Sequence, residues 1–327
     1  MSQSTPQNDQ PNLVEDTAVA INEALSIPSP PIQQRPSNDW EYTDVYQNIT
    51  AALYSLPAYF KTDLVITGVL ATDLFTFNTS LGATIETQVV AALNSMRSTW
   101  DPEQKYSLYS FVRQSQRFPD VILRATSPNV EPYIIMGIEL KGWYALAKEK
   151  EPSFRYRITP ACCALADLLV VFPWTLSGVI SGSPQLLQPY ITSARYASEY
   201  RNYWWEYIKE SGDRNKIRLS NVNHFYPQKS ELSSDVPEYD DGSNFGRFAR
   251  TSIMDEYMGR LFQEELSGIP LSAWQKFLSA FSEEKTAAQI DRAVTQAIRE
   301  TQRSRQPISE NIEAVKALLI RISALLE

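Results

Sequence analysis

The sequence predicts an α/β fold in which helix, strand, strand, strand, helix and strand follow one another, with additional helices at both ends. Three observations lead to this prediction. Apolar residues recur at helical spacing over residues 79–96. Three stretches rich in β-branched and aromatic residues follow the proline-containing break at 100–102. A short helix at 159–167 then leads into an apolar run at 168–174, which is typical of a buried strand.

The remaining elements follow from local signals of the same kind. The three strands are expected to be consecutive and antiparallel because turn-forming residues separate them. They are predicted at residues 106–114, 120–126 and 132–144. Further helices are predicted at 48–60, at 192–210 and from 248 to the C-terminus, with a polar loop at 229–244 between the last two. Residues 64–77 are ambiguous.

The composition divides the chain into three parts. Residues 1–45 are rich in Gln, Ser, Asn and Pro, which is typical of a flexible or loosely docked arm. Residues 46–228 hold the predicted sheet, and we expect any chemistry there. Residues 245–327 are expected to form a helical C-terminal region.

Scarce residue types exclude several classes of function. A single histidine, His224, and one adjacent cysteine pair, Cys162 and Cys163, cannot build a Cys/His zinc site or a metalloprotease motif. The cysteines are expected to be small buried hydrophobes. His224 could be a general acid or base, or a structural or surface residue of a loop. No glycine-rich phosphate-binding motif is present, so no nucleotide cofactor is expected. No export signal or apolar span is found, which favours a cytoplasmic protein without membrane contact.

The most informative segment pairs Pro119-Asp120 with Glu139-Leu140-Lys141. If the strands that carry these residues form a hairpin, its turn is centred midway between positions 120 and 139. A symmetric register then places Asp120 opposite Glu139, with their Cβ atoms about 4.5–5.5 Å apart. The sequence thus predicts two carboxylates side by side at one end of the hairpin.

Side-chain alternation along the two strands supports this register. One face is predicted to be apolar and to contain Val121, Leu123, Ala125, Ile134, Met136, Ile138 and Leu140. The other face is predicted to carry the polar cluster Asp120, Arg124, Glu139 and Lys141. The chain has three Glu-x-Lys triplets, and only the one at 139–141 ends an apolar strand.

Two facing carboxylates repel each other unless a cation lies between them. Mg²⁺ suits such a pair, because it binds one or two carboxylates and keeps waters and phosphate oxygens as further ligands. Lys141 is predicted on the same face, where it could orient or deprotonate an attacking water. Metal-assisted phosphodiester hydrolysis is the predicted chemistry. The plainer alternative is a hairpin with a solvated charged face.

These motifs and the order of elements resemble the PD-(D/E)xK nuclease superfamily, and within it the type II restriction endonucleases. The resemblance implies a restriction-endonuclease-like core, a mixed central sheet flanked by helices. It implies that Asp120 and Glu139 bind one or two Mg²⁺ ions, that the carbonyl of Leu140 completes the site, and that Lys141 positions the nucleophilic water. Glu86 matches an acidic residue of the preceding helix in many members, or is a solvated helix residue.

Charge is unevenly distributed along the chain, whose net charge is −8. Residues 1–104 carry −9, residues 105–229 carry +6 and residues 230–327 carry −5. A basic middle segment is expected of a protein that contacts phosphates. The candidate DNA-binding residues are Lys148, Lys150, Arg155, Arg157, Arg195 and Arg201. Tyr203, Trp204 and Trp205 could stack on bases or belong to the core.

Three hypotheses follow. The first is a Mg²⁺-dependent double-stranded DNA endonuclease of restriction type, acting as a homodimer and, by resemblance, leaving 5′-phosphate and 3′-hydroxyl ends. The second is a nuclease subunit of a larger defence, repair or transposition complex whose partner supplies specificity. An apolar stripe between Ile312 and Leu325 would then serve that partner, a dimer mate or the chain's own core. The third is an interaction protein without catalysis.

Overall fold

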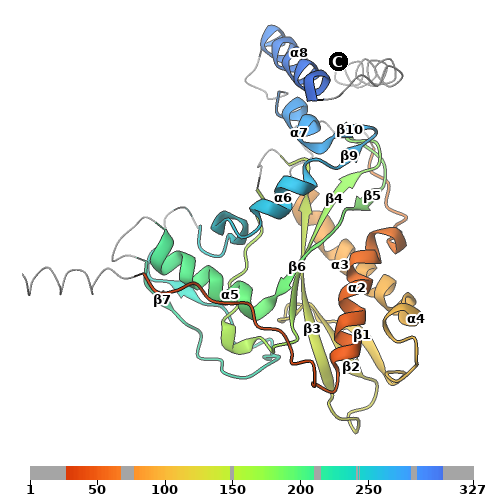
Figure 1. Ribbon diagram of the computed structural model, residues 1–327, viewed down its shortest axis with the longest axis vertical. Coiled ribbons are helices and arrows are strands. Elements are labelled where there is room, and N and C mark those ends of the chain that lie inside the picture. Colours follow the sequence, from red (N-terminus) through yellow and green to blue (C-terminus); the bar gives the residue numbers. More distant parts are fainter. Residues whose placement is uncertain are drawn as a thin grey trace, which may run out of the picture.

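The computed structural model describes residues 27–67, 77–147, 151–209, 215–240, 242, 244–280 and 286–304. At its centre is a mixed six-stranded sheet. Figure 1 shows the sheet running lengthwise through the molecule, with helices on both sides. The predicted α/β class, with a mixed central sheet and flanking helices, is therefore confirmed.

The first three strands form an antiparallel meander in the order β1-β2-β3, as predicted. They are β1 (Tyr109–Arg113), β2 (Val121–Ala125) and β3 (Ile134–Tyr144). Strand β4 (Leu168–Leu176) lies next to β3 and parallel to it. The chain makes this crossover through the short helix η2 (Pro160–Cys162), which is shorter than the sequence predicts.

Two short strands extend the sheet beyond β4 and were not predicted. Both β5 (Pro184–Leu186) and β6 (Tyr190–Ser193) pair antiparallel to β4. The prolines and glycines of this stretch give no strand signal, and the two segments become strands by pairing with β4. All nine residues of β4 are buried, as expected for a strand covered on both faces.

Helices cover the two faces of the sheet unequally. Helix α3 (Phe77–Ser95) packs on β1 and β3 and is backed by α2 (Thr43–Tyr59) and α4 (Arg97–Trp100). Helix α5 (Ala194–Tyr203) contacts β4 and β6 and lies on the other side of the sheet in Figure 1. It continues as one π-helical segment, η3 (Trp204–Ile208). The site described below depends on the strands between these layers.

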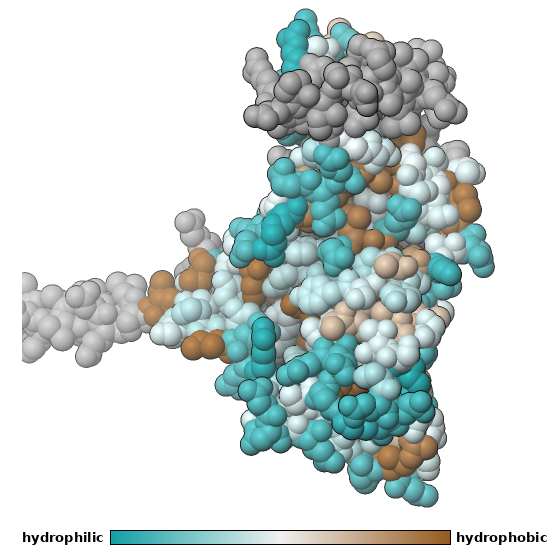
Figure 2. Space-filling view, turned by 45° about the vertical axis from the view of Figure 1, so that its right-hand side comes forward, coloured by the Kyte–Doolittle hydropathy of each residue, from teal (hydrophilic) through white to brown (hydrophobic). Residues whose placement is uncertain are grey.

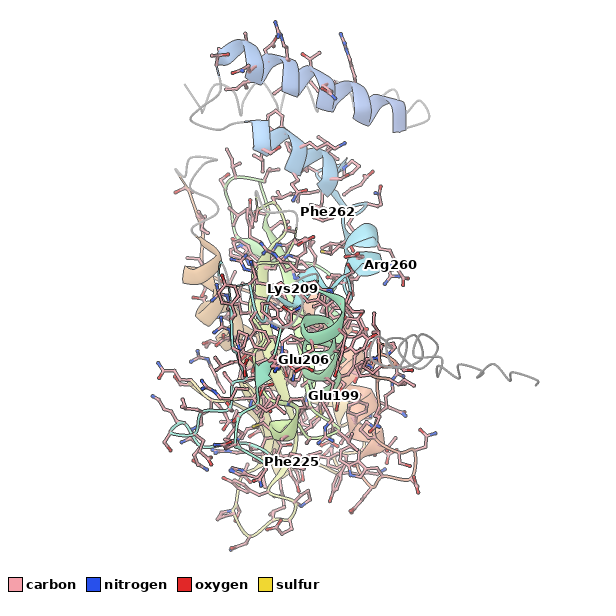
Figure 3. The ribbon with its side chains drawn as sticks, turned by 90° about the vertical axis from the view of Figure 1, so that its left-hand side faces the viewer. Glu199, Glu206, Lys209, Phe225, Arg260 and Phe262 are labelled. Carbon is pink, nitrogen blue, oxygen red and sulfur yellow. The ribbon has the colours of Figure 1, made fainter. Side chains whose placement is uncertain are left out.

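The described part of the C-terminal region is mainly helical, as periodicity predicts. A tight hairpin interrupts it, because Ser267 and Gly268 both adopt positive φ and form a two-residue turn. The elements are η6 (Phe248–Thr251), α6 (Asp255–Leu261), β9 (Glu265–Leu266), β10 (Ile269–Pro270), α7 (Leu271–Ala280) and α8 (Ala287–Ser304). Phe262, labelled in Figure 3, anchors this region by packing edge-on to Trp143 of β3, with ring centroids 5.9 Å apart.

A second small hairpin lies in the long loop after η3. It pairs β7 (Ile217–Arg218) with β8 (Val236–Pro237). The loop between β7 and β8 reaches the end of the central sheet. Residues of this loop and residues at the end of the β2–β3 hairpin line a common cleft. The polar loop predicted at 229–244 therefore contains part of this hairpin.

On the face shown in Figure 2, hydrophobic residues form small separate patches among hydrophilic ones. Among the helices of the described residues, none combines the length and the apolar character needed to cross a bilayer. Residues 27–42 contain neither helix nor strand, and α2 begins at Thr43, close to the predicted end of the N-terminal arm. Residues 1–26 and the predicted stripe from Ile312 to Leu325 lie outside the described part of the chain.

Candidate active site

The β2–β3 hairpin has the register that its turn predicts. Val121 lies opposite Ile138, and Ile122 lies opposite Gly137. One step further along the same register, Asp120 faces Glu139. The two carboxylates therefore come together at the end of the hairpin that is remote from its turn.

Nearer the turn, the hairpin departs from the symmetric register. A bulge between Leu123 and Arg124 shifts the register, so Arg124 pairs with Ile134. Its guanidinium lies over the ring of Tyr133, 5.9 Å from the centroid, and away from the carboxylates. The polar face is also smaller than expected, because Ile122 and Ile135 on that side are buried.

The loop before Asp120 is fixed by backbone bonds. Gln114 N–H donates to the carbonyl of Asp120 at 2.6 Å, and the Gln114 side chain donates to the carbonyl of Pro119 at 2.9 Å. Pro119 packs against Gly137, where an added Cβ would lie 2.3 Å from the proline Cγ. The absence of a side chain at Gly137 thus allows Pro119 to sit on β3 and aims Asp120 at the end of the strand.

Three polar groups meet at this point. The N–H of Leu140 donates to Asp120 Oδ2 at 2.8 Å. The Lys141 ammonium donates to Glu139 Oε1 at 2.6 Å and lies 4.0 Å from Asp120 Oδ2. The lysine therefore bridges both carboxylates, and the sequence-predicted trio is assembled.

The site holds more negative charge than its protein surroundings offset. Burial and then the nearby charge of Glu139 raise the pKa of Asp120 to about 8, against the opposing effect of Lys141. Burial works against the charge of Lys141, but Glu139 and Asp120 outweigh it, so the pKa of Lys141 is raised. Lys141 is therefore held as an ammonium ion.

Asp120 and Glu139 open into a cleft of about 250 Å³. Its walls come from the β1–β2 loop and from the loop between β7 and β8. The other lining residues are Gln116, Arg117, Phe118, Ile158, Pro227, Gln228, Lys229, Glu231 and Ser233. Arg117 and Phe118 directly precede the Pro119-Asp120 motif. The other lining residues were not marked by the motif, because the β7–β8 loop has no sequence pattern that links it to the hairpin.

Glu86 lies on α3 and is not part of the cleft wall. Its carboxylate accepts from Arg113 of β1, with an N–O distance of 2.8 Å. Its charge still contributes to the raised pKa of Asp120. Glu86 is thus close enough to act electrostatically, while its own side chain is held by an arginine.

Two of the candidate DNA-binding arginines are used inside the fold. Arg201 is 2% exposed and donates to Asp235, to Asn202 and to two backbone carbonyls. Arg195 donates twice to the carbonyl of Cys163. For Arg201 the expectation of DNA contact is wrong, because burial keeps the guanidinium out of reach. In Arg195, two guanidinium nitrogens are already used in hydrogen bonds to a backbone carbonyl.

The other candidates divide in a similar way. Arg157 donates to the carbonyl of Phe245 at 3.3 Å and lies 3.7 Å from Asp240, so it serves the fold. Arg155 is exposed. Lys148 and Lys150 lie outside the described residues.

Helix α5 and its π-helical extension do not present a basic surface. Figure 3 shows Glu199 and Glu206 along this helical segment, with Lys209 at its end and Phe225 beyond its other end. Lys209 lies over the ring of Trp205, 3.5 Å from its centroid, and Trp205 is buried. The core interpretation of Trp205 is confirmed, and Trp204 is partly buried.

Asp167 is a structural residue that no sequence motif marks. It is fully buried, and its carboxylate accepts from the N–H groups of Gly137 and Ala164 and from the hydroxyl of Tyr226. These bonds tie β3 to the start of β4 and to the β7–β8 loop. The sequence offers one indication of this role, since Asp167 directly precedes a buried strand. Many aspartates in loops occupy such a position, so the indication is weak.

The scarce residues behave as expected. Cys162 and Cys163 are buried free thiols. His224 is exposed and its Nε2 lies 2.9 Å from Glu231. His224 lies outside the cleft, whereas Glu231 lines it.

The donor set at this point consists of oxygen atoms, the kind of ligand that Mg²⁺ prefers. Two carboxylates are available at the end of the hairpin, and the carbonyl of Leu140 directly follows Glu139 in the chain. Within the part of the chain that the structure describes, no group of three or more His, Cys, Asp or Glu could hold a metal ion. Mg²⁺ commonly uses one or two carboxylates plus waters and phosphate oxygens, so a pair such as Asp120 and Glu139 could hold it.

Comparison of the chain with protein-family models, with curated proteins and with solved structures finds no match.

Proposed function

We propose that this protein is a Mg²⁺-dependent endonuclease that hydrolyses phosphodiester bonds of double-stranded DNA. The observation that carries the proposal is the meeting of Asp120, Glu139 and Lys141 at one end of the β2–β3 hairpin, with both carboxylates lining an open cleft. Such a cluster costs stability when it is left uncompensated, because two partly buried carboxylates repel each other. A function that uses a bound cation explains the arrangement.

The order of the elements supports a restriction-endonuclease-like core. Helix α3 is followed by the β1–β2–β3 meander, a crossover through η2, and β4 parallel to β3. The resemblance of the Asp120 and Glu139-Leu140-Lys141 motifs to the PD-(D/E)xK superfamily implies that same order. The α5 layer and the C-terminal helices would then be additions to the core.

The residues divide the chemistry between them. Asp120 and Glu139 would hold Mg²⁺, with the Leu140 carbonyl as a further ligand. The bound ion would offset phosphate charge and make water a better nucleophile. Lys141, kept protonated by its carboxylate neighbours, donates to the attacking water or to a phosphate oxygen and fixes its direction. By resemblance, the products carry 5′-phosphate and 3′-hydroxyl ends.

The direct test is to incubate the purified chain with mixed plasmid and phage DNA in MgCl₂ and to sequence the new ends. The proposal expects cleavage that needs Mg²⁺ and that stops in EDTA. Recurrent sequence at the ends would show restriction-type specificity. If duplex DNA stays intact over a wide range of enzyme and Mg²⁺ concentrations, hydrolysis of duplex DNA is not the function.

Single substitutions test the site. Asp120→Ala, Glu139→Ala and Lys141→Ala should each lower the cleavage rate on the order of 10²–10⁴-fold, while DNA binding survives. The matched controls come from a second Glu-x-Lys triplet, in which exposed Lys105 and Glu103 form an ion pair of 2.8 Å outside the cleft. Glu103→Ala and Lys105→Ala should cut like the wild type. Wild-type cutting by Asp120→Ala would contradict the assignment.

A second candidate is a nuclease whose sequence specificity comes from a partner protein, and the positions of two arginines favour it. Arg195 and Arg201, expected to read bases, are used within the fold. A partner would then supply sequence specificity. Site-specific cutting by the purified chain alone would reject this version, and light scattering would show whether that active species is the expected homodimer.

A further inference from the structure

Two basic residues line the catalytic cleft, Arg117 from the β1–β2 loop and Lys229 from the β7–β8 loop. Both side chains are exposed. Neither makes a hydrogen bond or an ion pair with another residue of the described structure. They differ in this respect from Arg157, Arg195 and Arg201, whose donors are engaged by the fold.

The backbone beneath each of these side chains is anchored. The Glu231 carboxylate accepts from Gln228 N–H at 2.6 Å, and Glu231 N–H donates back to the Gln228 carbonyl at 2.9 Å. Lys229 therefore lies in a closed turn. Arg117 precedes Phe118, which is 4% exposed, and the bonds from Gln114 fix the end of its loop. In both residues the charged end of the side chain has no partner in the described structure, while the neighbouring backbone is held in place by hydrogen bonds.

The charge of the cleft gives these cations a role. Asp120, Glu139 and Glu231 line the same cleft, so an anionic substrate would be repelled without compensation. Glu231 is already engaged by His224 and by the Gln228 N–H. Arg117 and Lys229 are therefore the lining cations left to face a substrate, and an arginine fork or a lysine ammonium suits phosphate oxygens.

We propose that Arg117 and Lys229 form a phosphate-binding pair that holds the DNA backbone next to Asp120 and Glu139. The proposal rests on the proposed nuclease function and names the residues that dock its substrate. It also shifts the expected DNA contact from α5 to the two loops around the cleft.

The test measures binding separately from cutting. Fluorescence anisotropy with a labelled DNA duplex, in EDTA so that no hydrolysis takes place, gives Kd at several KCl concentrations. Losing one phosphate contact should lower the slope of log Kd against log[KCl] by about 0.9, which weakens binding roughly eightfold at 0.1 M salt. Arg117→Ala and Lys229→Ala should each show this loss. The double variant should show about twice the change in slope. Lys229→Arg should retain binding.

The controls are Lys216→Ala and Arg292→Ala, which remove exposed cations outside the cleft. Their Kd and salt slope should match the wild type, and circular dichroism should show every variant folded. If Arg117→Ala and Lys229→Ala keep the wild-type Kd and slope while the wild type cuts DNA, the phosphate-binding pair is wrong and the nuclease stands. If the two variants weaken DNA binding but neither they nor the wild type cleaves DNA, the phosphate-binding pair is supported and the proposed hydrolysis is wrong.

Discussion

At the scale of single residues, Asp167 shows how the fold supports the site without taking part in the chemistry. Its two carboxylate oxygens each accept a backbone N–H, from Gly137 at 2.7 Å and from Ala164 at 2.8 Å. Gly137 lies two residues before Glu139 on β3. Asp167 therefore fixes the strand that delivers the second carboxylate of the site.

Asp167→Asn should destabilise the protein. One of its carboxylate oxygens becomes an NH₂ group, which cannot accept a hydrogen bond from a buried backbone N–H. The expected loss in the free energy of unfolding is roughly 1–3 kcal/mol, measured by urea unfolding. Asp291→Asn, on an exposed position of α8, is the control and should leave stability unchanged.

The size of this loss should depend on pH. Burial raises the pKa of Asp167 from 3.8 to about 6, although its hydrogen bonds oppose the shift. Because the folded pKa is above the unfolded one, the stability contributed by the protonated form is complete below about pH 4 and is lost as the pH rises through 6. The stability difference between wild type and Asp167→Asn should shrink over this window. A difference that is constant with pH would contradict the shift.

At the scale of elements, the β2–β3 hairpin carries the site, and its packing against Pro119 sets where Asp120 points. An alanine at Gly137 would bring its Cβ to 2.3 Å from Pro119 Cγ and 3.0 Å from Asp167 Oδ1. Neither neighbour is the end of a flexible chain. Pro119 would have to move, and Asp120 follows it directly in sequence.

Gly137→Ala should therefore lower both stability and activity. Overpacking of this kind costs about 1–3 kcal/mol, and a small displacement of Asp120 should slow cleavage by up to about 10²-fold. Gly259→Ala is the control, because nothing lies within 4 Å of its added Cβ on α6, and alanine favours the helix. Equal behaviour of the two variants would show that Pro119 does not position the site.

At the scale of the whole molecule, the net charge of −8 gives little hint of the site. The excess of basic residues lies in the middle of the chain, between residues 105 and 229. Several of these side chains form hydrogen bonds or ion pairs inside the fold, as Arg201 does with Asp235. Within the fold, Asp120 and Glu139 share a single ion-pair partner, Lys141, so their charge is only partly compensated. The molecule as a whole is therefore expected to respond to a divalent cation.

Mg²⁺ should stabilise the folded protein by mass action. For a dissociation constant of about 1 mM, 10 mM MgCl₂ contributes about 1.4 kcal/mol, so the melting temperature should rise. Glu139→Gln removes one ligand charge and should abolish most of this rise. NaCl at equal ionic strength is the control for screening. An equal rise in wild type and Glu139→Gln would place any Mg²⁺ binding elsewhere.

Local patterns in the sequence determined the three-stranded meander, the buried strand β4, the hairpin register and, through that register, the pairing of Asp120 with Glu139. These features depend on residues within about 25 positions of each other, so turn chemistry and alternation are enough to predict them. Only the tertiary structure decided the added strands β5 and β6, the burial of Arg201, the role of Asp167 and the approach of Lys229 to the cleft. These depend on contacts between segments distant in sequence, where the same arginine or lysine can pair internally or face solvent, and only packing selects between the two.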